Sequence, residues 1–206
     1  MSYDHASMLC CGLGPTFGAL QRMEVSAEET ILITGMGPVG LGGVINTVHR
    51  GARVIATAHN EYRAELARTL GAEVIIDDSS DDTLKKKKEL THGLGVDAAI
   101  ESAGATEAQQ LCLNAVRRNG QVAFVGESGD VTVKISDQLI RNGLHLHGVW
   151  HYNLNDVPAL FDVAIKCADK LDQLITHTFP LANVIDAWEL QLSRQCGKVI
   201  LHPWKN

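Results

Sequence analysis

Three glycines in one short turn have the clearest chemical implication in this sequence. They are Gly35, Gly37 and Gly40, and Pro38 and Val39 lie between the last two. The first glycine allows a sharp turn, the second lets a ligand approach the backbone without a Cβ in the way, and the third allows a helix to pack closely. Pro38 suits the first turn of such a helix, where its missing N–H costs nothing. The turn is therefore suited to bind phosphate.

Regular secondary structure is predicted on both sides of this turn. Thr30–Thr34 is apolar and β-branched, which predicts a buried strand, and Pro38–His49 is an apolar stretch of helical length. A second strand is predicted at Arg53–Thr57. This order is the context that a dinucleotide-binding turn requires. Because a helix start offers free N–H groups and partial positive charge, we expect the turn to hold the pyrophosphate of NAD or NADP. The alternative is a purely structural glycine turn.

The end of the second strand should select between the two cofactors. NAD-binding domains normally carry an acidic residue there to hold the ribose hydroxyls, but Ala58 follows the strand here. Without that carboxylate a 2′-phosphate is not repelled, and Arg63 is near enough in sequence to reach one. His59 and Asn60 are expected to hydrogen-bond a ribose in either cofactor. The choice between NAD and NADP stays open from the sequence.

Strands and helices alternate along most of the 206 residues. The predicted strands of the repeating part are 30–34, 53–57, 74–76, 97–100 and 121–125, and a strand at 144–149 is predicted after the pattern changes at Gly126. The predicted helices of the repeating part are 38–49, 61–70, 82–91 and 106–116. A short strand at 131–135, helices at 136–141, 156–168 and 183–192, a segment at 174–179 and a last strand at 198–202 complete the prediction. Apolar strands in repeated βα units predict an α/β fold, a Rossmann-type doubly wound parallel sheet.

Composition excludes several classes of partner. A formal net charge of −6 argues against general binding to nucleic acid or anionic membranes. The four lysines Lys85 to Lys88 are adjacent, so on a helix they surround it and form no single basic face. No stretch approaches the ~20 apolar residues of a membrane helix, and Asp4 replaces the positive charge expected of a signal peptide. We therefore expect a cytoplasmic protein.

Cysteine and histidine side chains show no metal-ligand spacing. The cysteines are Cys10, Cys11, Cys112, Cys167 and Cys196, an odd and scattered set that is no disulfide framework. Among the nine histidines, only His145 and His147 alternate along one predicted strand and so project together. A metal site built from the histidines is a weak alternative.

Motifs along the whole chain resemble one enzyme family. The segment from Ala6 to Ala19 is similar to the hinge of the zinc-dependent medium-chain dehydrogenases, the alcohol and sorbitol dehydrogenase family. The resemblance extends through the glycine turn to further motifs at 70–72, 101–104, 124–126, 175–181 and 196–201. The order of these motifs is more specific than any one of them.

The resemblance implies roles for particular residues. Cys11 matches the family's cysteine ligand of the catalytic zinc, and Val125 and Gly126 match backbone that lines the nicotinamide pocket. The stretch from Val149 to His151 matches the same pocket, and Lys198 matches a basic residue that touches the cofactor phosphates. The alternatives are a buried thiol at Cys11 and an ordinary surface lysine at Lys198.

Two departures from the family pattern put part of this in question. Pro15 occupies the place of the family's threonine and Thr16 follows one position later, so a threonine contact to the nicotinamide is in doubt. The family's other zinc ligands and its proton relay precede the hinge and have no counterpart here, and Cys11 alone cannot supply the three protein ligands of a catalytic zinc. Zinc is therefore expected only in a complete enzyme, and no residue of this chain is assigned a catalytic role.

These observations predict three parts and one function. Residues 1–25 are expected to be the hinge segment, 26–170 the dinucleotide-binding domain and 171–206 a segment returning toward a catalytic domain. The resemblance implies the NAD(P)-binding portion of an oxidoreductase that transfers hydride between the nicotinamide and an alcohol, polyol or carbonyl substrate. It also implies a homo-oligomer. The alternative is a non-catalytic dinucleotide-binding module.

Overall fold

A parallel sheet forms the centre of the molecule. The computed structural model describes residues 1–77, 89–127 and 129–204. The six strands are β1 (Thr30–Thr34), β2 (Arg53–Thr57), β3 (Val74–Ile76), β4 (Val96–Glu101), β5 (Val116–Phe124) and β6 (His145–Gly148). All pair in parallel, in the order β3-β2-β1-β4-β5-β6. The predicted doubly wound sheet is therefore confirmed.

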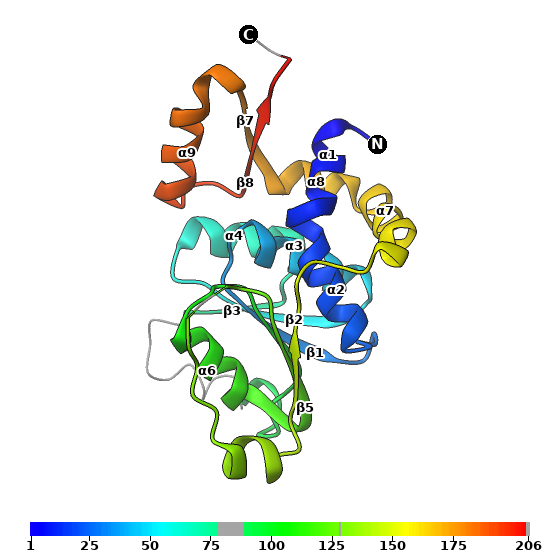
Figure 1. The fold of residues 1–206 in the computed structure, drawn as a ribbon, viewed down its shortest axis with the longest axis vertical. Helices are drawn as coiled ribbons and strands as arrows, with labels where there is room; N and C mark the ends of the chain where they lie inside the picture. Colours follow the sequence, from blue (N-terminus) through cyan, green and yellow to red (C-terminus); the bar gives the residue numbers. More distant parts are fainter. Residues whose placement is uncertain (78–88, 128, 205–206) are drawn as a thin grey trace.

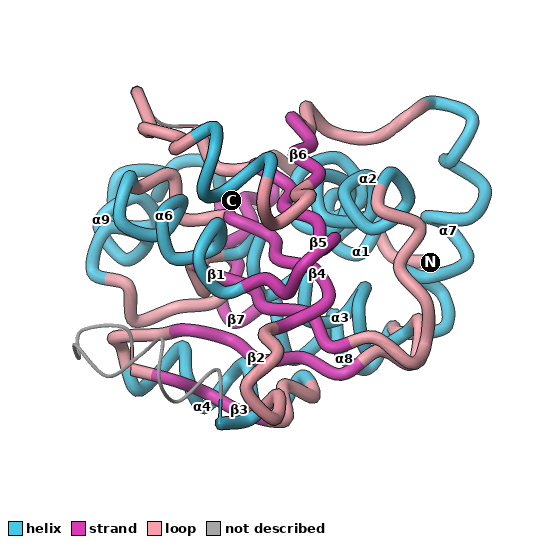
Figure 2. Tube along the Cα trace, turned by 90° about the horizontal axis from the view of Figure 1, so that it is seen from below, coloured by secondary structure: helices cyan, strands magenta, loops and turns pink. Residues whose placement is uncertain are grey.

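Helices cover both faces of this sheet (Figures 1 and 2). One face carries α2 (Gly14–Arg22), α3 (Pro38–His49), α4 (Glu61–Leu70), α7 (Val157–Lys166) and α8 (Ala168–Leu174). The other carries α6 (Thr106–Ala115), whose buried Cys112, Leu113 and Ala115 pack against the sheet. Central strands β1 and β4 are buried almost throughout, which explains the apolar runs at their centres, 31–33 in β1 and 98–100 in β4.

The structure departs from the sequence prediction after β5. No strand forms at 131–135, because this segment lies along α6 and not in the sheet: Thr106 Oγ1 donates to the carbonyl oxygen of Asp130 (3.2 Å). Val131 and Val133 pack on the apolar cluster beneath α6, so their alternation reflects burial without a strand partner. A π-helix, η2 (Ile135–Ile140), follows. The part of the predicted helix 82–91 that includes Lys85 to Lys88 lies outside the described residues.

The predicted helix at 156–168 is divided. A 3-10 turn, η3 (Leu154–Asp156), leads into α7, and Cys167 then separates α7 from α8. Cys167 has φ −108° and ψ +27°, which is outside the helical region. The break lets α8 pack against α4 while α7 lies beside the N-terminal segment.

The N-terminal segment is helical and packs on α3. It comprises α1 (Tyr3–Met8), the π-helix η1 (Leu9–Leu13) and α2. A Cβ added to Gly42 of α3 would clash with the carbonyl oxygen of Gly12, so the two backbones are almost in contact. The buried Asn46 of α3 donates through Nδ2 to the carbonyl oxygen of Leu13 and to Thr16 Oγ1, both at 2.9 Å.

The C-terminal residues form a separate small sheet. Strand β7 (Ile175–Pro180) pairs in parallel with β8 (Lys198–His202), and η4 (Leu181–Asn183) and α9 (Val184–Ser193) connect them. This unit lies at the top of Figure 1, at the opposite end from α6. Helix α9 exposes Ile185, Trp188 and Leu192, each about two thirds accessible to solvent.

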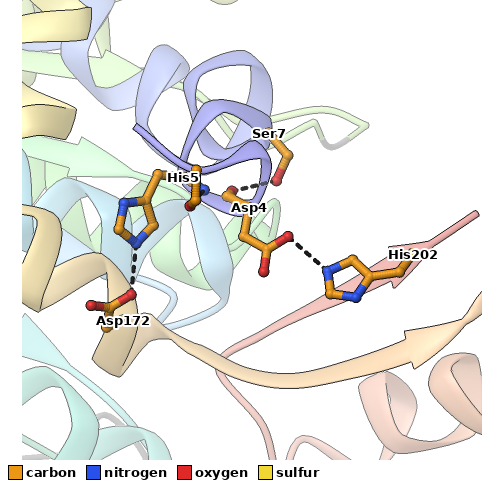
Figure 3. A network of polar contacts seen from close by, with 6 residues as sticks. Asp4, His5, Ser7, Asp172 and His202 are labelled. Carbon is orange, nitrogen blue, oxygen red and sulfur yellow. Dashed lines mark hydrogen bonds and ion pairs between the residues drawn. The ribbon is translucent and has the colours of Figure 1, made fainter. Parts of the chain in front are cut away.

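Two histidine–aspartate contacts tie α1 to the C-terminal part (Figure 3). His202 on β8 lies 2.7 Å from Asp4, between Nε2 and Oδ1. His5 makes the same contact with Asp172 of α8, also at 2.7 Å. The indole of Trp204 stacks on the His202 ring, with centroids 5.3 Å apart. The first helix of the chain is thus joined in space to α8 and to the last strand, β8.

We predict that Gly42→Ala destabilises the fold by about 1–3 kcal/mol, because its methyl group would clash with the carbonyl of Gly12 and push α3 away from η1. For a chain of this size each kcal/mol lowers the melting temperature by about 2–4 °C. Gly148→Ala is the matched control, since a Cβ there meets no atom within 4 Å. Equal melting temperatures for the two variants in a thermal unfolding scan would contradict the prediction.

Candidate functional site

The carboxyl ends of the parallel strands bring most of the predicted site residues to one edge of the sheet. Gly35 follows β1, Ala58 follows β2, Val125 follows β5 and Val149 follows β6. The strand order reverses between β1 and β4, and a crevice outside the carboxyl ends at this switch point is where open α/β sheets bind ligands.

The glycine turn is held in a tight conformation. Gly35 has φ +79°, a left-handed backbone conformation that favours glycine. The N–H of Gly37 donates to the carbonyl oxygen of Gly35 at 2.9 Å, and α3 begins at Pro38. A Cβ added to Gly40 would clash with the carbonyl of Gly35 and lie 2.8 Å from Ser102 Oγ. Close packing therefore requires glycine at Gly35 and Gly40.

Gly37 differs from its two neighbours because it faces open space. A Cβ added to it would meet no atom within 4 Å, and its φ of −78° is accessible to any residue. The protein's own packing thus gives no reason for glycine here. A ligand that approaches the backbone would give one, and the first amides of α3 have no acceptor within the helix. Val39, half-buried, lies in this first turn.

The turn after β4 forms the second side of the site. Ser102 Oγ donates to the carbonyl oxygens of Thr34 (2.5 Å) and Gly35 (3.1 Å), which joins this turn to the glycine turn. A Cβ added to Gly35 would lie 2.5 Å from the backbone N of Ala103. The two turns therefore approach each other backbone to backbone.

Glu101, the last residue of β4, is a fully buried carboxyl group at this edge. Its Oε1 accepts hydrogen bonds from the N–H groups of Ala103 (2.7 Å) and Gly104 (2.9 Å). Burial raises the pKa of Glu101 above the ordinary value, and the amides of Gly104, Ala103 and Ala105 oppose this rise because they favour the ionised form. Loss of hydration is the larger of the two effects on its pKa.

The residues after β2 take part in local structure. Asn60 caps α4: its Oδ1 accepts the N–H of Arg63 at 3.1 Å. Arg63 Nε donates to the carbonyl oxygen of Cys196 at 3.3 Å, which joins α4 to the segment before β8. His59 is exposed beside Ala58, which is half-buried. Arg63 is half-buried and partly engaged with the C-terminal unit, a contact that the sequence did not predict.

The predicted nicotinamide side lies at the ends of β5 and β6. The N–H groups of Val125 and Gly126 both donate to the carbonyl oxygen of Glu101, at 2.9 and 3.0 Å. The N–H of Val149 donates to the carbonyl oxygen of Phe124 at 3.0 Å. His151 has φ +54°, and its Nδ1 lies 3.0 Å from the carbonyl oxygen of Cys10, so the segment after β6 folds back on η1.

Lys198 and Cys11 lie outside this strand edge. Lys198 begins β8, is half-buried and pairs with Ile175 of β7. The thiol of Cys11 in η1 is free and exposed, so it is not the buried cysteine of the alternative hypothesis. Within residues 1–77, 89–127 and 129–204, no group of three or more His, Cys, Asp or Glu side chains could hold a metal ion. The described residues therefore do not form a zinc site by themselves.

Sequence reasoning assigned no role to Glu101 and Ser102. The available signal was a charged residue directly after the apolar run 98–100, since buried carboxyl groups are rare and need partners. The contacts of Ser102 with the carbonyls of Thr34 and Gly35 span more than sixty residues and gave no local pattern. No helix in the described part of the chain is long and apolar enough to cross a membrane.

Comparison with known proteins identifies the family. A family model described as zinc-binding dehydrogenase matches residues 38–166, more than half of the chain. This chain therefore belongs to the zinc-binding dehydrogenase family, as the motif order predicted.

Individual relatives are similar along nearly the whole chain. Alcohol dehydrogenase 1 of Artemisia annua is 31% identical over 210 residues, which cover 98% of this chain and 56% of the relative. Sorbitol dehydrogenase of Bacillus subtilis is 33% identical over 207 residues, covering 98% and 58%. The crystal structure of an alcohol dehydrogenase from Thermotoga maritima superposes with a TM-score of 0.90 at 28% identity, covering 98% and 59%. The chain thus spans less than two thirds of the length of these relatives.

The raised pKa of Glu101 predicts how stability depends on pH. The folded state binds this proton more tightly than the unfolded state, whose glutamate titrates at about 4.3. The contribution of Glu101 to stability is therefore full below that value and is lost as pH rises through the folded pKa. In urea unfolding between about pH 4 and pH 8, we expect wild type to lose stability relative to Glu101→Gln. A relative gain with rising pH would contradict this sign.

Proposed function

We propose that this chain binds NAD or NADP across the carboxyl edge of β1, β4 and β5. The observation that carries the proposal is the environment of Gly37, which is open and lies at the start of α3 in a turn otherwise closed by packing. In this proposal the Gly35-to-Gly40 turn holds the pyrophosphate. His59, Asn60 and Arg63 lie beside the adenosine ribose, and Lys198 contributes charge to the phosphates.

The nicotinamide is proposed to lie against Val125, Gly126 and Val149. When bound, the nicotinamide supplies hydride transfer, and the chain's own residues orient it and exclude water around it. The backbone amides of Val125 and Gly126 are already engaged with Glu101, so these residues present a defined surface. The residues that follow β2 favour neither cofactor. No acidic residue follows the strand, and the Arg63 side chain already donates a hydrogen bond to the carbonyl oxygen of Cys196.

The activity of the whole enzyme is the second part of this proposal. We propose that the chain is the NAD(P)-binding portion of an oxidoreductase acting on an alcohol, polyol or carbonyl substrate, as the names of its relatives suggest. Cys11 would be one zinc ligand in the complete enzyme, with the others supplied by sequence outside this chain. The exposed apolar side of α9, formed by Ile185, Trp188 and Leu192, is a surface typical of interfaces and supports a larger assembly.

Gly37→Ala separates ligand binding from folding. The added methyl group fits the protein alone but would occupy the space a pyrophosphate needs, so we expect the affinity for NADH and NADPH to fall at least about tenfold with no loss of melting temperature. Gly129→Ala is the matched control, because a Cβ there also meets no atom within 4 Å. Fluorescence titration of both nucleotides measures the effect and shows which one the chain prefers.

Two results would contradict the proposal. Wild-type protein that binds neither nucleotide would remove the dinucleotide site. Robust alcohol oxidation by this chain alone, with one zinc per chain, would remove the assignment as the cofactor-binding portion.

We also propose a cytoplasmic homo-oligomer. None of the five cysteines, all of which lie in the described part of the chain, forms a disulfide, which fits a reducing compartment. Strand β6 is an edge of the sheet, and its His145 and Leu146 are exposed, so a second copy has a strand to pair with. Sedimentation velocity is expected to show a dimer or larger species that Leu146→Lys converts to monomer. Wild-type protein that sediments only as a monomer would contradict this.

A further inference from the structure

The two oxygens of the Glu101 carboxyl group have unequal partners. Oε1 accepts hydrogen bonds from two backbone amides, those of Ala103 and Gly104. Oε2 is buried and has no hydrogen-bond partner in the described part of the chain. A Cβ added to Gly126 would lie 2.9 Å from Oε2, so this oxygen lies beside the proposed nicotinamide surface. A buried oxygen without a donor is costly to leave charged.

Glu101 also connects the two sides of the proposed site. Its main-chain carbonyl oxygen accepts the N–H groups of Val125 and Gly126. Its side chain holds Ala103, whose backbone N lies against Gly35 of the glycine turn. A change in the charge of this carboxyl group therefore acts on both the pyrophosphate side and the nicotinamide side.

Among the described residues, no Lys, Arg or His side chain forms an ion pair with Glu101. Other titratable side chains on the elements packed against β4, and in the turn after β5, are Glu107, Cys112, Arg117, Arg118, Glu127 and Asp130. Arg117 pairs with Asp97 near the opposite end of the sheet, at 2.6 Å. Burial raises the pKa of Glu101, and the backbone amides of Gly104, Ala103 and Ala105 oppose this rise.

We propose that Glu101 is a proton-linked positioning residue, and that the site binds a dinucleotide with this carboxyl group neutral. Above the pH at which the free protein loses this proton, binding is then accompanied by uptake of one proton from solvent onto Glu101. The inference rests on the proposed dinucleotide site. A bound pyrophosphate carries negative charge into the glycine turn, which contacts the turn that Glu101 holds. Salt weakens the repulsion between two charges in adjacent turns only a little, and it weakens the repulsion between buried charges even less. An ionised Glu101 would therefore oppose the ligand.

Linkage makes this coupling reciprocal. If the dinucleotide disfavours the ionised carboxylate, then ionisation weakens dinucleotide binding by the same factor. A carboxyl group with a purely structural role would change stability with pH but would exchange no proton when the ligand binds. Proton uptake on binding therefore distinguishes the two roles.

Isothermal titration calorimetry of NADH and NADPH, in pairs of buffers with different ionisation enthalpies, measures this uptake. We expect wild type to take up a proton over part of the range from about pH 5 to pH 9, with an affinity that falls about fivefold or more as pH rises through it. Glu101→Gln keeps the shape of the side chain but cannot titrate. It is expected to lose this uptake and this pH dependence while binding within about threefold of wild type at the acidic end. Glu107→Gln, which removes an exposed carboxylate of α6, is expected to keep the wild-type uptake.

Equal proton uptake by wild type and Glu101→Gln would overturn the proposal. If Glu101→Gln does not fold, infrared difference spectra of wild type with and without nucleotide decide instead. A protonated-carboxyl band that grows on binding supports the proposal, and its absence throughout the pH range overturns it. Failure of wild type to bind either nucleotide would refute the proposed function itself, which separates that failure from a failure of this inference.

Discussion

The backbone approach between the turn after β1 and the turn after β4 is the constraint on which the site depends. Gly35 lies against the backbone of Ala103, and Ser102 Oγ joins the two turns through the carbonyls of Thr34 and Gly35. Because the sheet reverses its strand order here, the chain leaves β1 toward α3 on one face and leaves β4 toward α6 on the other. This contact fills the space beside Gly35 and Gly40, whereas a Cβ added to Gly37 at the start of α3 would meet no atom within 4 Å.

The buried carboxyl group of Glu101 at this junction holds the turn after β4 by hydrogen bonds, and its burial makes its ionisation costly. Glu101 organises the turn after β4 through its side chain and the end of β5 through its carbonyl oxygen. A neutral amide would supply similar hydrogen bonds with less desolvation, so the carboxyl group has an energetic disadvantage that packing alone does not explain. Such local disadvantages are common at functional sites, where a property other than stability is retained.

Polar contacts join the C-terminal unit both to α4 and to the N-terminal helix α1. Arg63 joins α4 to Cys196, immediately before β8, and the His202–Asp4 contact joins the end of β8 to α1. Lys198 lies between these two contacts along the chain, so residues at both ends of β8 fix its position relative to α4 and α1. A movement of β7 and β8 would therefore change contacts both at α4 and at the N-terminal helices, which carry the exposed thiol of Cys11.

The sequence by itself determined the α/β class, the bounds of β1, β2, α3 and α4, and the position of the glycine turn, because these depend on local periodicity and on steric needs of single residues. The order of the motifs along the sequence also indicated the correct protein family. Only the tertiary structure decided that the valines at 131 and 133 lie under α6 without a strand partner, and that Arg63 contacts Cys196. It alone showed that Glu101 is buried and that its Oε2 accepts no hydrogen bond from the residues the structure describes. These features arise from contacts between residues distant in sequence, for which burial and hydrogen-bond geometry leave no periodic pattern.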